Sequence, residues 1–252
     1  MKGKKVLITR SEEDNKSFRE QLERKGAEVF QLPMIQFQLS EELTVIHQQL
    51  EQLETIDWIV FTSAKTVEFF FQIADSKGIK FYYYPNLKIA TVGEKTKLKL
   101  EQLGYRTNFV PIQYTAEVLA ENMDENIEGK RILIPQSNLA SNKYFEVFKQ
   151  RGAIPVPVAI YETLPVYYST EELETVMHQK IDYLTFTSGS TFEAFYQNMQ
   201  HAKVEITAEK IICIGPSTAK VAEQNGNAVS AIAAPHTTEG MIKAIENLED
   251  YV

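Results

Sequence analysis

Hydroxyl side chains recur in this sequence at places where an apolar segment gives way to an amphipathic one. The clusters are Thr62-Ser63, Thr96, Thr115, Thr187-Ser188, Ser217-Thr218 and Thr237-Thr238. A serine or threonine at such a place caps a helix N-terminus, which stabilises the helix by about 1 kcal/mol. The same geometry can bind an anion, because the first N–H groups of a helix are free and carry partial positive charge. The residues leave capping alone and capping with anion binding equally open.

The elements that must position these hydroxyls are short apolar segments. They span residues 6–8, 58–61, 89–92, 131–134, 183–186 and 211–214. Each is followed by a segment with helical periodicity, an alternation typical of a parallel sheet covered by helices on both faces. The predicted fold class is therefore α/β. In such a sheet the strand-to-helix turns all lie at the carboxyl edge, where ligands bind.

An internal repeat divides the sequence into two similar halves. Residues 62–70 resemble residues 187–195, and the glycine turn at 92–96 resembles the one at 214–218. Residues 114–117 likewise resemble 236–239, and Asn15-Lys16-Ser17-Phe18 at the front of the first half resembles Asn142-Lys143-Tyr144-Phe145 in the second. In this alignment Gln136 takes the place of Arg10. The repeat predicts two α/β units of one design, and by itself it suggests a tandem split near Glu128.

Two further segments lack helix signals and join the units. Residues 33–38 and 156–163 mix β-favouring side chains with proline, a composition typical of extended segments. They occupy equivalent places in the two halves. We expect them to be crossing connections that pair with each other as a two-stranded hinge.

Charge and composition exclude several classes of protein. The chain has 26 Lys and Arg residues against 34 Asp and Glu residues, a net charge of −8, which argues against nucleic acid and anionic membrane surfaces as partners. No apolar run approaches the ~20 residues of a membrane span. The apolar run 6–8 behind the basic N-terminus is too short for a signal peptide. With a single cysteine, Cys213, there is no intramolecular disulfide, and we expect a cytoplasmic protein.

Other catalytic chemistries find no support in the sequence. The histidines, His47, His178, His201 and His236, are scattered and lack the spacing of a zinc site. Cys213 lies inside an apolar segment, where a cysteine behaves as a small buried hydrophobe. The fingerprints of a nucleophile elbow and of nucleotide-binding loops are absent from the sequence. We therefore expect neither a metal nor a cofactor.

Taken in order along the whole chain, several segments resemble the uroporphyrinogen-III synthase family. These are residues 6–10 (VLITR), 61–63 (FTS), 92–96, 160–163 (IYET), 186–188 (FTS) and 214–219 (IGPSTA). The resemblance implies two similar parallel-sheet α/β domains joined by a two-stranded β-ladder hinge, with the active-site cleft between them. It also implies that domain 1 is discontinuous, comprising residues 1–36 and 164–252, and that domain 2 comprises residues 37–163. This topology replaces the tandem split that the repeat suggests.

The family reaction that the resemblance implies is the cyclisation of hydroxymethylbilane, a linear tetrapyrrole with eight carboxylates, to uroporphyrinogen III. Water is lost and ring D is inverted through a spiro-pyrrolenine, which makes the enzyme a hydro-lyase of haem biosynthesis. Much of the catalytic task is positioning, and this accounts for the missing catalytic constellation. The implied enzyme is monomeric and cofactor-free, and hydroxymethylbilane synthase can hand over its substrate.

The resemblance also assigns roles to individual residues. Tyr161 matches the family's tyrosine in the crossing segment and is the candidate catalytic residue, with interdomain packing as its alternative role. Thr96, Ser217 and Thr218 match family positions in the glycine turns and would bind substrate carboxylates. The remaining candidates for carboxylate binding are Ser63, Ser188, Arg10, Thr115 and Thr238. For Arg10 a structural salt bridge is an equal alternative, and Lys65 is expected to be a solvated lysine at a helix start.

Two rival functions fit parts of the same pattern. A two-domain binding protein that closes about a hinge would also need the repeat and the crossings, but would show no turnover. A two-domain glycosyl or phosphoryl transferase would need a nucleotide site, for which the sequence has no fingerprint. The net charge of −8 does not exclude the octa-carboxylate substrate, because helix N-termini and hydroxyls bind anions without net charge.

Overall fold

The chain folds into two compact α/β units. The computed structural model describes residues 1–124, 126–206 and 210–250. Unit 1 comprises residues 1–37 and 164–252, and unit 2 comprises residues 38–163. The expected first boundary, after residue 36, lies one residue before the observed one, after residue 37. Each unit contains one five-stranded sheet, and each is described separately below.

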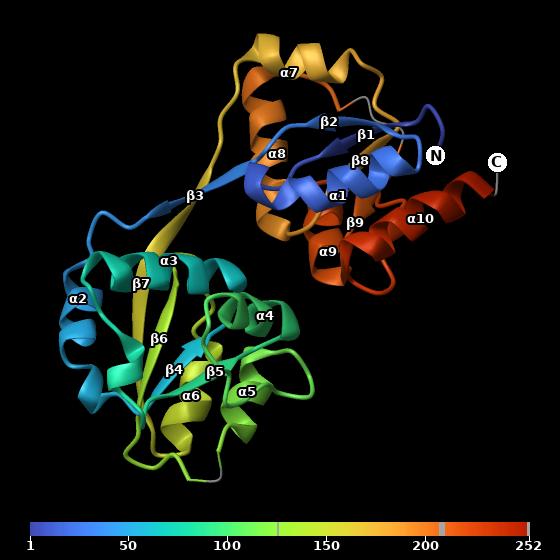
Figure 1. Ribbon diagram of the computed structural model, residues 1–252. Coiled ribbons are helices and arrows are strands. Elements are labelled where there is room, and N and C mark those ends of the chain that lie inside the picture. The colour runs from blue at the N-terminus through green and yellow to red at the C-terminus, as the bar shows by residue number, and fades with distance from the viewer. Residues whose placement is uncertain (125, 207–209, 251–252) are drawn as a thin grey trace. The chain divides into compact units, whose positions relative to one another are not determined.

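The sheet of unit 1 is parallel and has the strand order β10-β9-β8-β1-β2 (Figure 1). Its strands are β1 (Lys5–Ile8), β2 (Glu28–Gln31), β8 (Tyr183–Phe186), β9 (Lys210–Cys213) and β10 (Ala231–Ile232). The N-terminal strand β1 lies between β2 and β8, so the sheet joins both ends of the chain. The predicted apolar segments at 6–8, 183–186 and 211–214 are confirmed as strands, to within one residue.

Helices cover both faces of this sheet, as the alternation of its side chains requires. The helices are α1 (Glu12–Arg24), α7 (Thr170–Met177), α8 (Gly189–Ala202), α9 (Pro216–Gln224) and α10 (Thr238–Asp250). Val6 and Ile8 pack with residues of α1 and α10, whereas Leu7 packs with residues of α7, α8 and α9. Successive residues of β1 thus supply two separate cores, the pattern of a buried parallel strand.

The sheet of unit 2 has the strand order β3-β7-β6-β4-β5. Its strands are β3 (Ile35–Leu39), β4 (Trp58–Phe61), β5 (Lys88–Thr91), β6 (Arg131–Ser137) and β7 (Ile154–Pro165). β3 and β7 contain the two crossing segments and are hydrogen-bonded neighbours. However, β7 also pairs in parallel with β6 from Ile154 to Tyr161. The expected pairing of the two crossings with each other is confirmed, whereas a hinge made of these two strands is not, because both are strands of the larger sheet.

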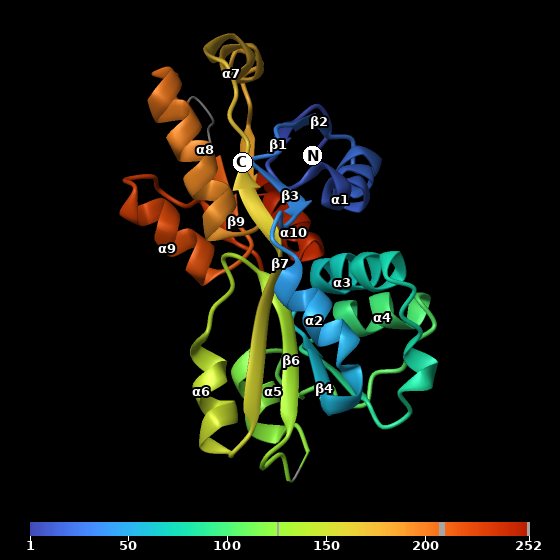
Figure 2. The same cartoon turned by 90° about the vertical axis from the view of Figure 1, so that its left-hand side faces the viewer.

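The helices of unit 2 are α2 (Thr44–Glu51), α3 (Ala64–Ser76), α4 (Glu94–Gln102), α5 (Ala116–Asn122) and α6 (Lys143–Gln150), with short 3-10 helices at Leu53–Thr55 and Phe81–Tyr83. Figure 2 shows α5 and α6 on one face of the sheet and α3 and α4 on the other. Trp58, Val60 and Ile134 pack with residues of α5 and α6. The carboxyl edge of this sheet therefore carries helix starts on both faces.

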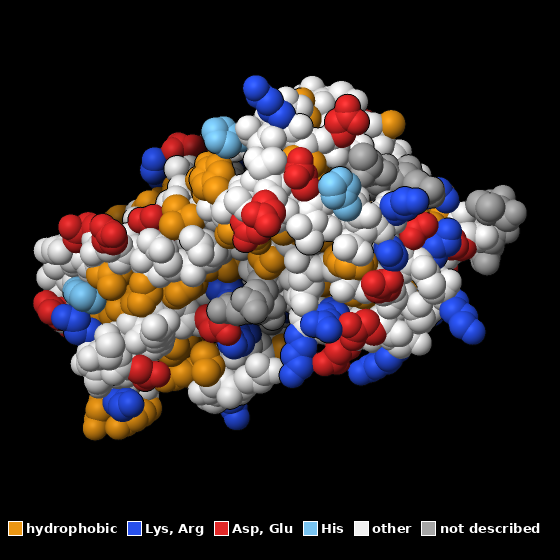
Figure 3. Space-filling view, turned by 90° about the horizontal axis from the view of Figure 1, so that it is seen from above, with side chains coloured by type: hydrophobic (Ala, Val, Ile, Leu, Met, Phe, Trp, Pro, Cys, Tyr) orange, Lys and Arg blue, Asp and Glu red, His pale blue; other side chains and the backbone are white. Residues whose placement is uncertain are grey.

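The surface is of mixed charge, and none of the helices in the described ranges is long and apolar enough to cross a membrane. On the face seen in Figure 3, acidic and basic side chains are interspersed. The acidic side chains on this face do not form one continuous patch.

Candidate functional site

Most of the predicted site residues lie at the carboxyl edge of one sheet or the other. In unit 1 they are Arg10 after β1, Ser188 after β8, Ser217 and Thr218 after β9, and Thr238 after β10. In unit 2 they are Ser63 after β4, Thr96 after β5, and Thr115 at the start of α5. Tyr161 lies within β7. The sequence-predicted set is thus divided between the units, with a group of helix starts in each.

The two glycine turns of the repeat have the same backbone geometry. Gly93 (φ −152°, ψ 168°) precedes α4, and Gly215 (φ −164°, ψ 171°) precedes α9. No side chain caps either helix, so N–H groups remain available to an anion at both turns. Thr96 and Thr218 are only 5% and 2% exposed, whereas Ser217 is exposed. Of the candidates in the glycine turns, Ser217 is therefore more accessible than Thr96 and Thr218.

An aromatic ring lies over each glycine turn. A Cβ at Gly93 would lie 3.6 Å from Tyr114, and a Cβ at Gly215 would lie 3.7 Å from His236. Nδ1 of His236 is hydrogen-bonded to the carbonyl oxygen of Ala233 at 2.7 Å. The sequence prediction did not select Tyr114 or His236, although the repeat aligns them.

The serine of each repeated Thr-Ser pair is a helix cap. Ser63 accepts a hydrogen bond from the N–H of Thr66 at 3.1 Å, and Ser188 accepts one from the N–H of Thr191 at 3.1 Å. At α8 the Thr191 hydroxyl also accepts from the Ser188 N–H, which completes a capping box. Capping is thus confirmed for both serines, while carboxylate binding by them stays a prediction.

A threonine caps α5 of unit 2 and the equivalent helix α10 of unit 1. Thr115 accepts a hydrogen bond from the N–H of Val118 at 3.2 Å. In unit 1 the equivalent bond runs from the N–H of Gly240 to Thr237, at 3.1 Å. Thr238 instead lies in the first turn of α10, with its hydroxyl 3.4 Å from Glu239 Oε2. Thr237 therefore occupies the place of Thr115, and the site prediction missed it by one residue.

Removal of the serine caps should destabilise the protein measurably. We expect Ser63→Ala and Ser188→Ala each to lower the free energy of unfolding by about 1 kcal/mol, with the larger loss at Ser188 because its capping box is lost. Urea denaturation followed by circular dichroism measures the change. Ser217→Ala is the matched control, because Ser217 is exposed and caps no helix. Equal midpoints for Ser188→Ala and Ser217→Ala would contradict the prediction.

Lys65 at the start of α3 differs from the expected solvated lysine. Its side chain is 15% exposed and lies 2.8 Å from the carboxylate of Glu68. Lys99 of α4 reaches the same carboxylate at 2.6 Å. Burial acts to raise the pKa of Glu68, but the hydrogen bonds from Lys65 and Lys99 outweigh it and lower the pKa. Two ammonium groups thus share one carboxylate near the Ser63 cap.

Tyr161 packs within unit 2. It is 6% exposed, and its ring stacks on Phe69 of α3 with centroids 4.9 Å apart and an interplanar angle of 18°. Gln136 pairs with Ala159, but the next residue of β6, Ser137, pairs with Tyr161. This β-bulge changes the alternation of β7, and it places the Tyr161 ring on the α3 side of the sheet. A chemical role of the phenol stays a prediction.

No metal or thiol chemistry is available at these edges in the part of the chain that the structure describes. Within it, no group of three or more His, Cys, Asp and Glu side chains could hold a metal ion. Cys213 is buried in β9. Burial, with a smaller effect of Glu223, raises the pKa of Cys213 to about 12. The thiol is therefore protonated at neutral pH and is not a nucleophile.

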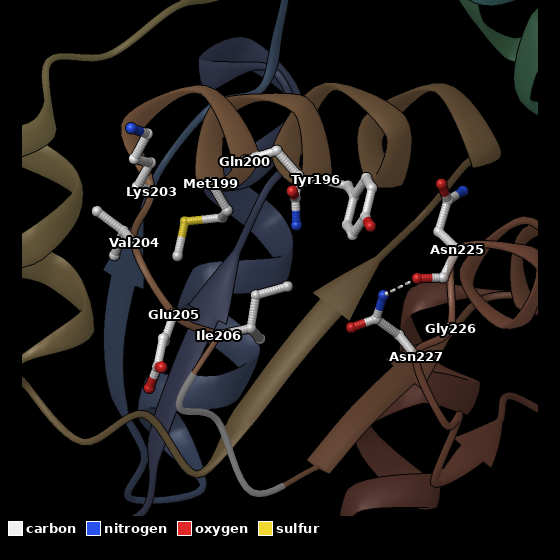
Figure 4. A pocket seen from close by; sticks show the side chains of 10 residues that line it. All are labelled: Tyr196, Met199, Gln200, Lys203, Val204, Glu205, Ile206, Asn225, Gly226 and Asn227. Carbon is white, nitrogen blue, oxygen red and sulfur yellow. Dashed lines mark hydrogen bonds between the residues drawn. The ribbon is translucent and has the colours of Figure 1, made fainter.

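A pocket of about 560 Å³ lies near the opposite ends of the unit 1 helices. Figure 4 shows it between the last turns of α8 and the end of α9, lined by Tyr196, Gln200, Lys203 and Asn225, with a hydrogen bond from Asn227 to the Asn225 carbonyl. Helix C-termini carry partial negative charge, which disfavours carboxylates. This pocket contains none of the predicted site residues, so it is not the candidate functional site.

Comparison with known proteins relates the chain to one family over nearly its full length. The family model described as uroporphyrinogen-III synthase HemD matches residues 16–243. The uroporphyrinogen-III synthase of Synechococcus elongatus is 26% identical over 251 residues, covering 97% of this chain and 95% of that protein. The porphyrin biosynthesis protein HemD of Ruminiclostridium josui is 29% identical over 95% of this chain. This chain spans about half of that longer protein, 47% of its length.

Solved structures show the same fold. The Helicobacter pylori uroporphyrinogen-III synthetase has a TM-score of 0.67 at 16% identity, covering 98% of this chain and 99% of that one. A mutant uroporphyrinogen III synthase from Thermus thermophilus has a TM-score of 0.65 at 15% identity, covering 99% and 100% of the two chains. With the match of the family model over residues 16–243, this chain belongs to the uroporphyrinogen-III synthase family.

Proposed function

We propose that this chain is a uroporphyrinogen-III synthase, which cyclises hydroxymethylbilane to uroporphyrinogen III with loss of water and inversion of ring D. The observation that carries the proposal is the pair of uncapped glycine turns with Thr96 and Thr218, one at the carboxyl edge of each sheet. A substrate with many carboxylates and no phosphate suits uncharged receptors made of N–H and hydroxyl groups.

The proposed reaction begins with the loss of the hydroxymethyl oxygen as water. The electron-rich pyrrole supplies the electrons as the C–O bond breaks, which leaves an azafulvene cation. The substituted α-carbon of ring D attacks this cation and gives a spiro-pyrrolenine. The bond from ring D to its original methylene bridge then breaks, and that methylene bonds to the free α-carbon of ring D, which loses its proton. Ring D is thereby turned over.

In this mechanism the enzyme contributes position and one hydrogen bond. Without assistance the chain closes at the free carbon and gives the type I isomer, so the held conformation decides the product. Each ~1.4 kcal/mol of preference changes the isomer ratio tenfold. We assign to the Tyr161 phenol a hydrogen bond to the departing hydroxyl, which assists the loss of water. The stack on Phe69 fixes the plane of its ring.

The test of this function is the isomer ratio of the product. Hydroxymethylbilane, freshly made by its synthase, is incubated with the protein, and the oxidised products are separated by isomer. We expect the type III isomer to dominate. A product with the type I excess of the uncatalysed reaction would overturn the proposal, and binding without turnover would favour a hinge-closing binding protein.

We also propose that the enzyme acts as a cytoplasmic monomer without a cofactor and receives its substrate from hydroxymethylbilane synthase. Sedimentation at micromolar concentration should then give the mass of one chain, 28.8 kDa. Activity should survive dialysis against a chelator.

A further inference from the structure

Five buried polar atoms in unit 2 have no hydrogen-bond partner among the described residues, and two of them belong to the connection from β6 to α6. These two are Oε1 of Gln136, at the end of β6, and the hydroxyl of Tyr144, in the first turn of α6. Gln136 is 9% exposed and Tyr144 is 3% exposed. Buried polar atoms are nearly always hydrogen-bonded, because an unpaired one has lost its water without compensation. These two atoms are only eight residues apart in the sequence, at the end of one element and the start of the next, and are candidates for groups that bind a ligand.

Both side chains belong to the same corner of the unit. Ile132, Ile134 and Tyr144 pack in one core cluster, and the two-residue alternation of β6 places Gln136 on that same face. Nε2 of Gln136 lies 3.4 Å from Oδ1 of Asn142, the residue that precedes α6. We call Gln136, Asn142, Tyr144 and the start of α6 the Gln136 corner. In Figure 2, α6 lies alongside β6 and β7 on this face.

The start of α6 adds an N–H donor to this corner. Asn142 does not cap the helix through its side chain. The Lys143 N–H donates to Ser141 Oγ, and the Phe145 N–H donates to the Asn142 carbonyl oxygen. The N–H of Tyr144 is therefore the donor available to a ligand. The hydroxyl of Tyr144 remains a donor, because burial and the Glu117 carboxylate both raise the pKa of Tyr144. The corner therefore combines one acceptor, the amide oxygen of Gln136, with a set of donors.

This combination fits a ligand with an N–H group and a carboxylate on one ring. We propose that the Gln136 corner binds one pyrrole ring of the linear tetrapyrrole. In this arrangement the ring N–H donates to Gln136 Oε1, and a side-chain carboxylate accepts from the hydroxyl and the backbone N–H of Tyr144. This inference rests on the proposed function and adds a binding site to it.

The repeat indicates why the site discriminates between rings. Arg10 takes the place of Gln136 in unit 1, and its guanidinium can donate hydrogen bonds but cannot accept them. A pyrrole N–H can therefore be accepted by the side chain in unit 2 and not by its counterpart in unit 1.

The test is Tyr144→Phe, which removes one unpaired hydroxyl and leaves the ring in place. We expect KM for hydroxymethylbilane to rise about tenfold, with kcat within about twofold of wild type, because one charge-assisted hydrogen bond is lost. We expect the thermal midpoint to stay the same or to rise, because the hydroxyl has no partner to lose. Gln136→Met, of similar length without the acceptor, should also raise KM.

Tyr183→Phe is the matched control. Tyr183 is as deeply buried, at 1% exposure, but its hydroxyl donates to Glu249. That variant should lower the thermal midpoint and leave KM unchanged, the reverse of Tyr144→Phe. Suppose that the wild-type protein makes the type III isomer, and that Tyr144→Phe and Gln136→Met both have the wild-type KM. The inference about the Gln136 corner is then wrong, and the proposed function stands. A wild-type protein that makes only the type I isomer would overturn both.

Discussion

Replacement of Tyr161 by phenylalanine should slow the formation of uroporphyrinogen III about 100-fold in kcat, within the range that a positioned proton donor contributes. The phenyl ring can keep the stack on Phe69, so only the hydroxyl is lost. We therefore expect the variant to stay folded, since no packing is removed. Steady-state kinetics with freshly made hydroxymethylbilane, combined with a thermal melt, tests both expectations.

The control for this experiment is Tyr168→Phe. The hydroxyl of Tyr168 donates to the carbonyl oxygen of Pro33 at 2.7 Å, so its loss should lower stability without a change in kcat. Unchanged turnover in Tyr161→Phe would restrict Tyr161 to packing. A fall in kcat that is accompanied by an equal fall in folded protein would lead to the same conclusion.

The largest expected effect on stability is the loss of the phenylalanine that ends a central strand in each unit. Phe186 packs against Phe192 and Phe195, with centroids 4.9 and 5.3 Å away. Phe61 packs against Phe70 at 5.2 Å. Phe186→Ala and Phe61→Ala should each lower the free energy of unfolding by about 3–5 kcal/mol, the usual cost of a large cavity in a core.

Each unit carries its own natural probe for this experiment. The single tryptophan, Trp58, lies in unit 2, and the single cysteine, Cys213, lies in unit 1. In Phe186→Ala, Cys213 should react with a thiol reagent at lower urea while the fluorescence midpoint of Trp58 stays constant. In Phe61→Ala the reverse should hold. Phe186→Leu and Phe61→Leu are the milder controls, and an equal shift of both probes in every variant would show that the chain unfolds as one cooperative unit.

The strands could be predicted because apolar runs in a parallel sheet are short and continuous. The segments 58–61 and 183–186 coincide with β4 and β8. β2 and β10 were missed because they are weaker signals: β2 has glutamate and glutamine at its ends, and β10 has two residues. The length of β7 was underestimated, because its prolines suggested a connection, whereas Pro155 and Pro157 lie in register with β6.

The site could be predicted only where local sequence determines geometry. Ser63 and Ser188 cap helices because a serine after a strand and before a helix has the required backbone conformation. The orientation of Tyr161 could not be predicted, since it depends on a bulge in the pairing of β6 with β7. The missing hydrogen-bond partner of Gln136 Oε1 could not be predicted either, because it depends on how the folded chain packs and has no signal in the sequence.

The discontinuity of unit 1 has a consequence for synthesis on the ribosome. β1 is made before unit 2, but its neighbour β8 is made after unit 2, and the pairing of Val6 with Tyr183 must wait for it. Unit 2, residues 38–163, is complete by then and can fold while translation continues. During this interval Val6, Leu7 and Ile8, all fully buried in the finished protein, have no sheet to enter. The apolar residues of β1 therefore stay without their β8 partner until most of the following chain has been made.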